Sequence, residues 1–384
     1  MFTPIPPIFT PPRVYVLKEV WQNPQAARRA ERLAASWPGI DVRTFTYDSL
    51  PDIVVEEGWD HGAKMGTMAA VPPPIPVLGL FRFDRDAIAA DATRMKDAYK
   101  GRGSFPFSLA AGDGAFVFFC SSTRNYPVKT LNDVKPCPEH VCRPQWRIHQ
   151  GRGCPHQCAY CSLGGYLITH VNTEDYIDRL ADLLAQNPWQ KTWLYDDVMD
   201  VLTLEPELDT LAPLMRFFER TGDRYLILHT KSDRVHGLIE ADAPHNTIIA
   251  WSLSGPTQSH RIEPVAGTTE SRIEAARQCQ DAGMTVRYKF KPIVPIKNWR
   301  EEAEYTVDLA LRRTKPDNLS MTTLMWMDSA ELTRCIPEEL LDAEFLQAAR
   351  NAHEEMKDSR VGPYPMRCAR KSTGTTSGPS GIVT

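Results

Sequence analysis

Three cysteines stand close together in the stretch GRGCPHQCAYCSLGG, residues 151–165. They are Cys154, Cys158 and Cys161, and they follow the spacing CxxxCxxC. Thiolate ligands favour zinc, copper(I) or iron–sulfur clusters. Three thiolates alone do not complete a tetrahedral site. The pattern therefore predicts a metal centre with either a further ligand or an open coordination position.

Two kinds of centre are compatible with this spacing. A structural zinc site normally has two ligand pairs, and no second CxxC or HxxxH follows at the usual distance, so His156 is the nearest candidate for a fourth zinc ligand. A [4Fe-4S] cluster has four irons, and a compact loop can hold three of them through cysteine. The fourth iron is then open to a small molecule, as the open position of a catalytic zinc site is.

Composition indicates an ordinary globular chain of 384 residues with a formal net charge of -4, so any nucleic acid has to bind in a local basic groove. The nine cysteines are odd in number and cluster in one loop, which favours metal ligation in a reducing compartment over disulfides. No apolar run is long enough to span a membrane, and the start MFTPIPPIFTPP is too rich in proline for a signal peptide. We expect a cytoplasmic protein without a membrane partner.

The N-terminal part has the pattern of a βαβ unit. Strands are predicted at RVYVL (13–17) and DVRTFTY (41–47), and residues 23–37 between them place Ala and Leu on one helical face. The signals weaken from about Leu50 to Gly114, and AFVFFC (115–120) is a further apolar strand. We expect an N-terminal α/β subdomain with an insertion over residues 1–145.

Beyond residue 145 strands and helices alternate regularly, as crossover units of a parallel sheet do. The six strand candidates are WRIHQ (146–150), KTWLY (191–195), YLILHTK (225–231), NTIIAWSLS (246–254), MTVRYKF (284–290) and NLSMTTLMW (318–326). Six repeats predict a partial (β/α)6 barrel over residues 146–326, because a closed barrel needs two more. Residues 327–384 are predicted to form a C-terminal extension whose small, polar tail is disordered.

The cysteine loop begins where the first of these strands ends, at the edge where parallel α/β folds collect their reacting groups. A CxxxCxxC loop in this place resembles the radical S-adenosylmethionine superfamily, and Tyr160 before the last cysteine suits the same pattern. The resemblance implies that Cys154, Cys158 and Cys161 hold a [4Fe-4S] cluster whose open iron chelates S-adenosylmethionine. It also implies an electron donor such as flavodoxin or ferredoxin, and a 5'-deoxyadenosyl radical that abstracts hydrogen from a substrate.

Later segments resemble the spore photoproduct lyase family, whose enzyme reverses a thymine dimer in DNA. They are THVNTEDY, LHTKSDRV, WSLSGPTQSHRIEP, SRIEAARQCQDAGMTV and KPIVPIKNW, and the likeness covers most of residues 13–310. The resemblance implies that Lys231 reaches the carboxylate of S-adenosylmethionine and that Ser252 hydrogen-bonds the cofactor. We expect Tyr160 and Asp200 to contact the cofactor as well. Glu263 in the RIEP segment also matches, as a functional group or as part of a structural salt bridge.

Two departures from that family affect the return of hydrogen to the product radical. The family uses a cysteine on the loop after the second barrel strand, where this chain reads WLYDDVMDVLTLE and has carboxylates instead. The family also carries a tyrosine after the third cluster cysteine, where this chain has Ser162. We therefore expect catalytic roles for Tyr160 and for Asp197, and we consider Cys142 as a relocated hydrogen donor.

The cysteines outside the loop leave other interpretations open. Cys137 and Cys142 in CPEHVC are compatible with a second metal site that includes His140 or His149, and equally with two ordinary thiols. Cys335 and Cys368 lie in the predicted C-terminal extension, from which either could approach the site.

The strand MTVRYKFKPI (284–293) carries a third departure. Alternation predicts that its apolar residues face the helices and that its cations face the barrel interior. The apolar set is Val286, Tyr288 and Phe290, and the cationic set is Arg287, Lys289 and Lys291. Buried cations need anions, so we expect Arg287, Lys289 and Lys291 to bind a phosphate or carboxylate of the substrate. A different register or an exposed strand end would be the alternative.

These features together predict a radical enzyme that abstracts hydrogen from an anionic substrate, with a nucleobase in a nucleotide or DNA as the expected substrate class. The enzymatic alternatives are true dimer repair with a relocated cysteine, and tailoring of a small amino-acid or natural-product substrate. The alternative from another class is a non-catalytic binding module in which His156 completes a zinc site.

Overall fold

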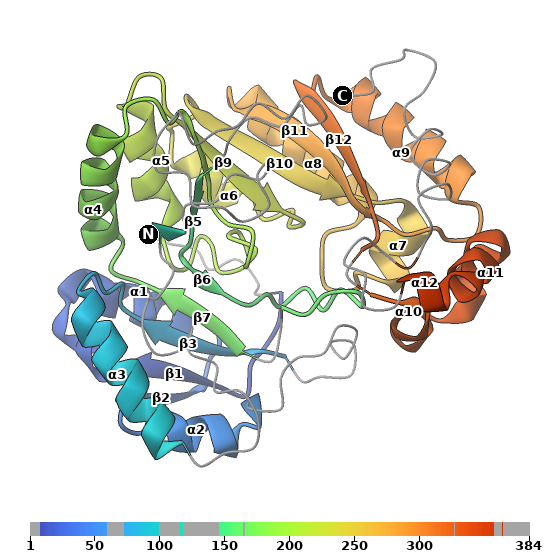
Figure 1. Ribbon diagram of the computed structural model, residues 1–384. Helices are drawn as coiled ribbons and strands as arrows, with labels where there is room; N and C mark the ends of the chain where they lie inside the picture. Colours follow the sequence, from blue (N-terminus) through green and yellow to red (C-terminus); the bar gives the residue numbers. More distant parts are fainter. Residues whose placement is uncertain are drawn as a thin grey trace.

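The computed structural model describes residues 8–59, 73–99, 116–117, 146–163, 166–325, 327–356 and 363. Within these ranges the strands form two sheets, of five and seven strands. The smaller sheet lies at the lower left of Figure 1, and the larger sheet crosses its upper half. The predicted α/β class is therefore confirmed.

The smaller sheet has the strand order β2-β1-β3-β7-β6. Its strands are β1 (Arg13–Leu17), β2 (Asp41–Phe45), β3 (Ile75–Gly79), β7 (Tyr166–His170) and β6 (Gly151–Arg152). The helices beside it are α1 (Pro24–Ala35), α2 (Leu50–Glu56) and α3 (Arg85–Ala98), and a 3-10 turn, η1 (Lys18–Gln22), precedes α1. The predicted βαβ unit is confirmed by the parallel pairing of β1 with β2.

Local chemistry explains where α1 begins. The Asn23 side chain accepts hydrogen bonds from the N–H groups of Gln25 and Ala26, and Pro24 occupies the first helical position, which needs no N–H donor. By contrast, β3, α2 and α3 fall in the stretch where the sequence signals were weak. The strand β3 is short, follows three consecutive prolines and is completely buried, so it shows no alternation.

The larger sheet has the order β12-β11-β10-β9-β8-β5-β4. Its parallel strands are β5 (Trp146–Ile148), β8 (Thr192–Leu194), β9 (Tyr225–Thr230), β10 (Thr247–Leu253), β11 (Thr285–Ile293) and β12 (Asn318–Thr323). The short strand β4 (Phe116–Val117) pairs antiparallel with β5 at one edge. All six predicted barrel strands are confirmed, and no closed barrel forms among the described residues.

Helices alternate with these strands along the chain. They are α4 (Thr173–Gln186), α5 (Leu211–Glu219), α6 (His236–Glu240), α7 (Pro256–Arg261), α8 (Thr269–Asp281) and α9 (Trp299–Arg313). In Figure 1, α4 lies at the left and α9 at the right of the sheet. The C-terminal elements are α10 (Ser329–Cys335), the 3-10 turn η6 (Glu338–Leu340), α11 (Ala343–Asn351) and α12 (His353–Met356). A capping box between Asp328 and Glu331 fixes the start of α10.

The two faces of the larger sheet differ in their packing. Trp251 of β10 and Tyr288 of β11 are completely buried, and they belong to the same core cluster as Phe218 of α5. The predicted alternation of β11 is confirmed, because Val286, Tyr288 and Phe290 are buried while the cations between them are not. A separate small cluster lies on the inner face and consists of Leu194, Ile227, Ile248 and Ala250.

The predicted domain limits, 1–145, 146–326 and 327–384, stay a prediction. The strands β6 and β7 lie after residue 145 but belong to the smaller sheet, where β7 pairs with β3. The smaller sheet therefore extends beyond the predicted limit at residue 145. The predicted disordered tail lies outside the described residues. In the described part of the chain, no helix has both the length and the apolar character needed to cross a membrane.

Candidate functional site

The cysteine loop connects β6 to the segment before β7. Cys158 is buried, Cys154 and Cys161 are half-buried, and none of the three is in a disulfide. Burial raises the pKa of each of these thiols. Gly153 opens the loop with φ of +109°, and a Cβ there would lie 2.2 Å from the carbonyl oxygen of Tyr166. Only glycine fits this close approach.

Backbone hydrogen bonds hold the loop against the larger sheet. The Gly153 N–H donates to the carbonyl of Val198 at 3.0 Å, on the segment that follows β8. The Ala159 N–H donates to the carbonyl of Ile262 at 2.9 Å, on the segment that follows β10 and α7. The three cysteines are thereby placed at the carboxyl-terminal edge of the parallel strands.

Asp200 links the loop to the end of β9. One of its carboxylate oxygens lies 3.0 Å from Nε2 of His156 and accepts the Lys231 N–H at 2.6 Å, and the other accepts the Thr230 hydroxyl at 2.9 Å and the Leu202 N–H at 3.1 Å. Burial opposes the charge of Asp200, but His156 and these donors lower its pKa. Asp200 therefore acts in this structure as a buried anchor, and its predicted contact with a cofactor stays a prediction.

Glu263 is a second buried anchor with no solvent exposure. Its carboxylate accepts hydrogen bonds from Lys231 at 3.1 Å, Gln258 at 3.0 Å, Ser254 at 3.1 Å, Arg272 at 2.6 Å and the Tyr160 hydroxyl. Burial would raise the pKa of Glu263, but the charges of Lys231 and Arg272 outweigh it and lower that pKa. The salt-bridge interpretation of Glu263 is the one that this geometry supports.

The structure brings Lys231 and Tyr160 together beside the cysteine loop. Lys231 Nζ lies 5.9 Å from the centre of the Tyr160 ring. Ser252 is half-buried on the neighbouring strand β10, in register with Lys289 of β11. The predicted roles of Lys231, Ser252 and Tyr160 toward S-adenosylmethionine stay predictions.

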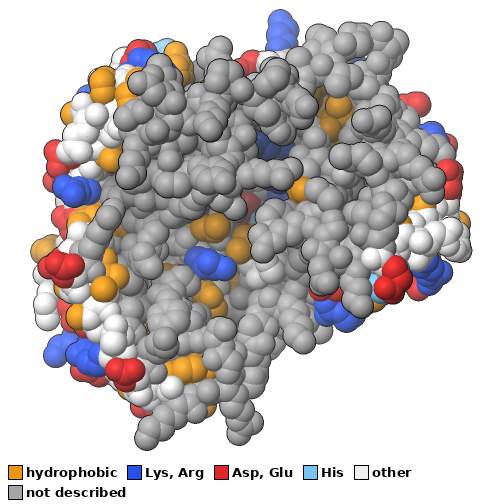
Figure 2. Space-filling model, in the orientation of Figure 1, with side chains coloured by type: hydrophobic (Ala, Val, Ile, Leu, Met, Phe, Trp, Pro, Cys, Tyr) orange, Lys and Arg blue, Asp and Glu red, His pale blue; other side chains and the backbone are white. Residues whose placement is uncertain are grey.

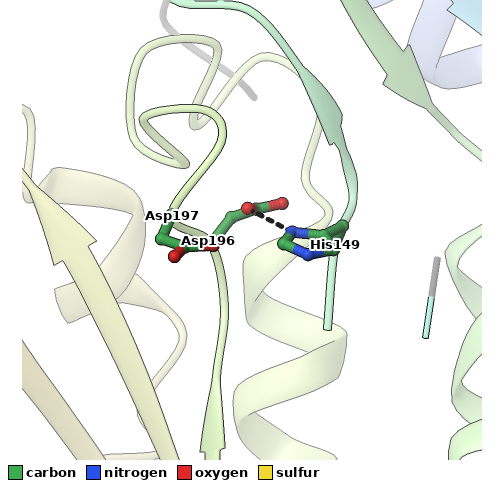
Figure 3. A group of neighbouring side chains, drawn as sticks. All are labelled: His149, Asp196 and Asp197. Carbon is green, nitrogen blue, oxygen red and sulfur yellow. Dashed lines mark hydrogen bonds and ion pairs between the residues drawn. The ribbon is translucent and has the colours of Figure 1, made fainter. Parts of the chain in front are cut away.

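Asp196, in the loop after β8, pairs with His149, which directly follows β5 (Figure 3). His149 Nδ1 lies 2.6 Å from Asp196, whose carboxylate also accepts the N–H groups of Gln150 at 3.0 Å and Val198 at 2.8 Å. Asp196 is fully buried and raises the pKa of His149 against the effect of burial. The ligand atoms of His149, Asp196 and Asp197 lie within 4.8 Å of one another, but the bonds to Asp196 already account for its position. We infer no second metal here.

Asp197 lies in the loop after β8, where the sequence resemblance implied a cysteine in the spore photoproduct lyase family. One carboxylate oxygen, Oδ2, lies 3.1 Å from Nε of Arg147. The other oxygen, Oδ1, is buried and has no hydrogen-bond partner among the described residues. Its predicted catalytic role stays a prediction. Cys142, the other predicted catalytic residue of this step, lies outside the described residues, as do Cys137 and Cys368.

A family model described as spore photoproduct lyase matches residues 132–364, more than half of the chain. The chain belongs to the spore photoproduct lyase family. The predicted resemblance is confirmed, and members of this family are radical S-adenosylmethionine enzymes that use a [4Fe-4S] cluster.

A curated relative is the spore photoproduct lyase of Geobacillus sp. (strain Y412MC61). It is 24% identical over 170 residues, which cover 41% of this chain and 48% of the relative, so the chain matches about half of the relative's length. Solved structures of spore photoproduct lyase share the fold. One is complexed with dinucleoside spore photoproduct, and another is a mutant with bound AdoMet and the same compound. Each has a TM-score of 0.61, 17% identity, and coverage of 96% of this chain and 95% of its own.

Within this family fold, the three predicted cations of β11 have different surroundings. Arg287 lies near the start of the strand, and its guanidinium makes two hydrogen bonds of 2.8 Å to Asp317. Lys289 Nζ contacts Nε2 of His229 on β9. Lys291 lies near the carboxyl end of the strand, with an exposed side chain. Lys289 and Lys291 therefore lie nearer the cysteine loop along β11 than Arg287 does.

Sequence reasoning missed several residues of this site, among them Arg147, His229 and Arg272. Arg147 and His229 occupy inward positions of predicted strands, so listing the inward residues of all six strands would have found them. Arg272 is completely buried on α8, and a helical pattern gives no sign that an arginine on its apolar side pairs with Glu263.

Proposed function

We propose that this protein is a radical S-adenosylmethionine enzyme that acts on a nucleobase carried by an anionic substrate, either a nucleotide or a DNA strand. One observation carries the proposal. A loop with three free thiols is bound, through Asp200, Glu263 and backbone hydrogen bonds, to the segments that follow β8, β9 and β10. These segments lie at the carboxyl-terminal edge of the strands, where parallel α/β folds have their catalytic and ligand-binding residues.

The donor set fits a [4Fe-4S] cluster. Cys154, Cys158 and Cys161 supply three soft ligands from one short loop, and the cluster needs four unless one iron is left for a small molecule. When bound, such a cluster supplies an open iron position and the electron for reductive cleavage of S-adenosylmethionine. An electron donor such as flavodoxin or ferredoxin belongs to this proposal.

The residues around the loop would position the cofactor. Lys231 carries a point charge suited to a carboxylate, and Glu263 and Asp200 hold its side chain and its backbone in place. Ser252, one strand away, offers a hydroxyl donor. Because Asp197 cannot donate a hydrogen atom as a thiol does, this loop would not return hydrogen to a product radical.

The substrate class rests on two supports. Solved relatives with the same fold are complexed with dinucleoside spore photoproduct, which favours a nucleobase. Lys289 and Lys291 lie on the inner face of β11, which favours an anion. True dimer repair and tailoring of a small amino-acid or natural-product substrate are the competing enzymatic proposals.

A zinc module remains a second candidate because of one observation. Nε2 of His156 lies 3.0 Å from the Asp200 carboxylate. Its Nδ1 is buried and has no hydrogen-bond partner among the described residues. A metal-bound histidine often has such a carboxylate partner on its other nitrogen. Under the radical proposal, His156→Ala keeps the iron content, whereas a Cys3His zinc site would lose its metal.

The decisive experiment purifies the protein without oxygen and measures metal and turnover. We expect brown protein with about four irons per chain, and 5'-deoxyadenosine when S-adenosylmethionine and dithionite are added. Ultraviolet-irradiated DNA, thymidine 5'-monophosphate and no substrate are then compared for stimulated turnover. Colourless protein with a single zinc, or iron-loaded protein that yields no 5'-deoxyadenosine, would contradict the proposal.

A further inference from the structure

Basic side chains from two strands lie on the inner face of the larger sheet. Arg147 lies on β5, and Lys289 and Lys291 lie on β11, two residues apart and therefore on the same face. His229 on β9 contacts Lys289 across the strand between them. In the space-filling view, Lys and Arg side chains are visible in a hollow near the centre of the face that Figure 2 shows.

The strand β10, which separates His229 on β9 from Lys289 on β11, carries small inner side chains toward its carboxyl end. On β10, Ala250 pairs with His229 of β9, and Ser252 pairs with Lys289 of β11. The inner face around these residues is apolar and is filled by Leu194, Ile227, Ile248 and Ala250. Leu194 is in register with Arg147. The basic side chains therefore border an apolar part of the inner face, and Lys289 and Lys291 lie toward the edge of the sheet where the cysteine loop lies.

The charges of Arg147, Lys289 and Lys291 all act on His229. Loss of solvent around the His229 ring, and then the charges of Lys289, Lys291 and Arg147, lower its pKa well below the usual value. A neutral His229 accepts a hydrogen bond from the Lys289 ammonium and so fixes its direction. Asp197 binds Arg147 directly, and its charge also acts on Lys291. Asp197, which lies just beyond the carboxyl end of β8, thus orients the Arg147 guanidinium.

We propose that Arg147, Lys289 and Lys291 form a subsite for a phosphate monoester on the substrate. A terminal phosphate offers three free oxygens and close to two negative charges, so each cation can donate to its own oxygen. A phosphodiester inside a DNA strand offers only two such oxygens and one charge. The inference rests on the proposed function, since it assumes that the substrate enters the barrel in front of the cysteine loop. It selects a free nucleotide over a DNA strand.

Binding of thymidine 5'-monophosphate tests this subsite. The iron-loaded protein with S-adenosylmethionine is titrated without oxygen, and its affinity for the monophosphate is compared with its affinity for thymidine. We expect Lys289→Gln and Arg147→Gln to lower the affinity for the monophosphate by tenfold or more and to leave thymidine affinity unchanged. Lys289→Arg keeps the charge and should restore most of the loss. Arg179→Gln, which removes an exposed cation from α4, is the matched control.

Two results would overturn the subsite. One is equal affinity of the unsubstituted protein for thymidine and for its monophosphate. The other is tighter binding of a thymine oligonucleotide without a terminal phosphate. Failure of the proposed function would look different, because it would show as absent iron or absent 5'-deoxyadenosine, whereas the phosphate preference is read from binding alone.

Discussion

Lys231 Nζ lies 3.1 Å from Oε1 of Glu263, and Arg272 Nη2 lies 2.6 Å from the other oxygen of the same buried carboxylate. A single anion therefore holds a strand-end lysine, a helix arginine and, through the Tyr160 hydroxyl, the cysteine loop. A buried charge is stable only while its partners are present. The integrity of the site consequently depends on Glu263.

Replacing this carboxylate should destabilise the whole fold. We expect Glu263→Ala to lower the free energy of unfolding by about 3–5 kcal/mol, because Arg272 stays buried without its anion. Urea denaturation at pH 7 measures the change. Glu274→Ala, on α8 like Arg272, removes an exposed pair with Arg277 and should cost less than about 1 kcal/mol. Equal costs for both variants would show that Glu263 is not the anchor described.

Lys231 should matter for the cofactor more than for stability. We expect Lys231→Gln to weaken binding of S-adenosylmethionine by about tenfold to a hundredfold, since a charge-assisted hydrogen bond contributes about 1.5–3 kcal/mol. Glu263 keeps Arg272, Ser254 and Gln258, so the loss of stability should be small. Equilibrium dialysis of the iron-loaded protein gives the affinity, with the exposed Lys297→Gln as control. An unchanged affinity would remove Lys231 from the cofactor site.

The three loop cysteines should be separable from the other cysteines by metal content. We expect Cys158→Ala to lose most of its iron, because only two thiol ligands remain. Cys279→Ala removes a thiol that is equally buried, on α8, and should keep its iron. Iron assay and visible absorbance after anaerobic purification make the comparison, and full iron in Cys158→Ala would place the cluster elsewhere.

Gly153 gives a test of how tightly the loop is fixed. Both Gly153 and Gly39 have positive φ, of +109° and +79°, but a Cβ at Gly39 meets nothing within 4 Å. We therefore expect Gly39→Ala to cost about 1–2 kcal/mol for the backbone conformation alone. Gly153→Ala should cost more and should also lower the iron content, since the loop must move away from Tyr166. Similar iron in both variants would mean that the loop tolerates the shift.

Glu205 predicts a pH dependence of stability. Burial, together with Asp209 and Glu207, raises its pKa from 4.5 to about 7. The folded state then binds the proton more tightly than the unfolded state, so this contribution to stability is complete below pH 4.5 and is lost as the pH rises through 7. At about 1.4 kcal/mol per unit, wild type should lose about 2–3 kcal/mol between pH 5 and 8 relative to Glu205→Gln.

Comparison with the variant isolates this one carboxyl group. Other groups, such as His170, whose pKa burial lowers to about 4, titrate in both proteins and cancel in the difference. Urea midpoints at four pH values between 5 and 8 are sufficient. Parallel pH profiles for the two proteins would show that Glu205 is not protonated in the folded state.

The sequence predicted the features that depend on local pattern. The strand β11 alternates apolar and cationic residues, and that alternation alone indicated which face meets the helices. The three cysteines indicated a metal by type and spacing. Long-range pairings left no such local sign. Nothing near Tyr166 shows that β7 joins β3, about ninety residues earlier, and nothing near His229 shows that Lys289 lies against it.

The pairing of β7 with β3 has a consequence for any shortened version of the protein. The cysteine loop is tethered at its start to the segment after β8 and continues into a strand that the N-terminal region clamps. A chain that started at Trp146 would retain Cys154, Cys158 and Cys161 and all six parallel strands of the larger sheet, yet its β7 would have lost the neighbour that fixes it. The N-terminal sheet thus supports the strand into which the cysteine loop continues, and its removal would leave that end of the loop without support.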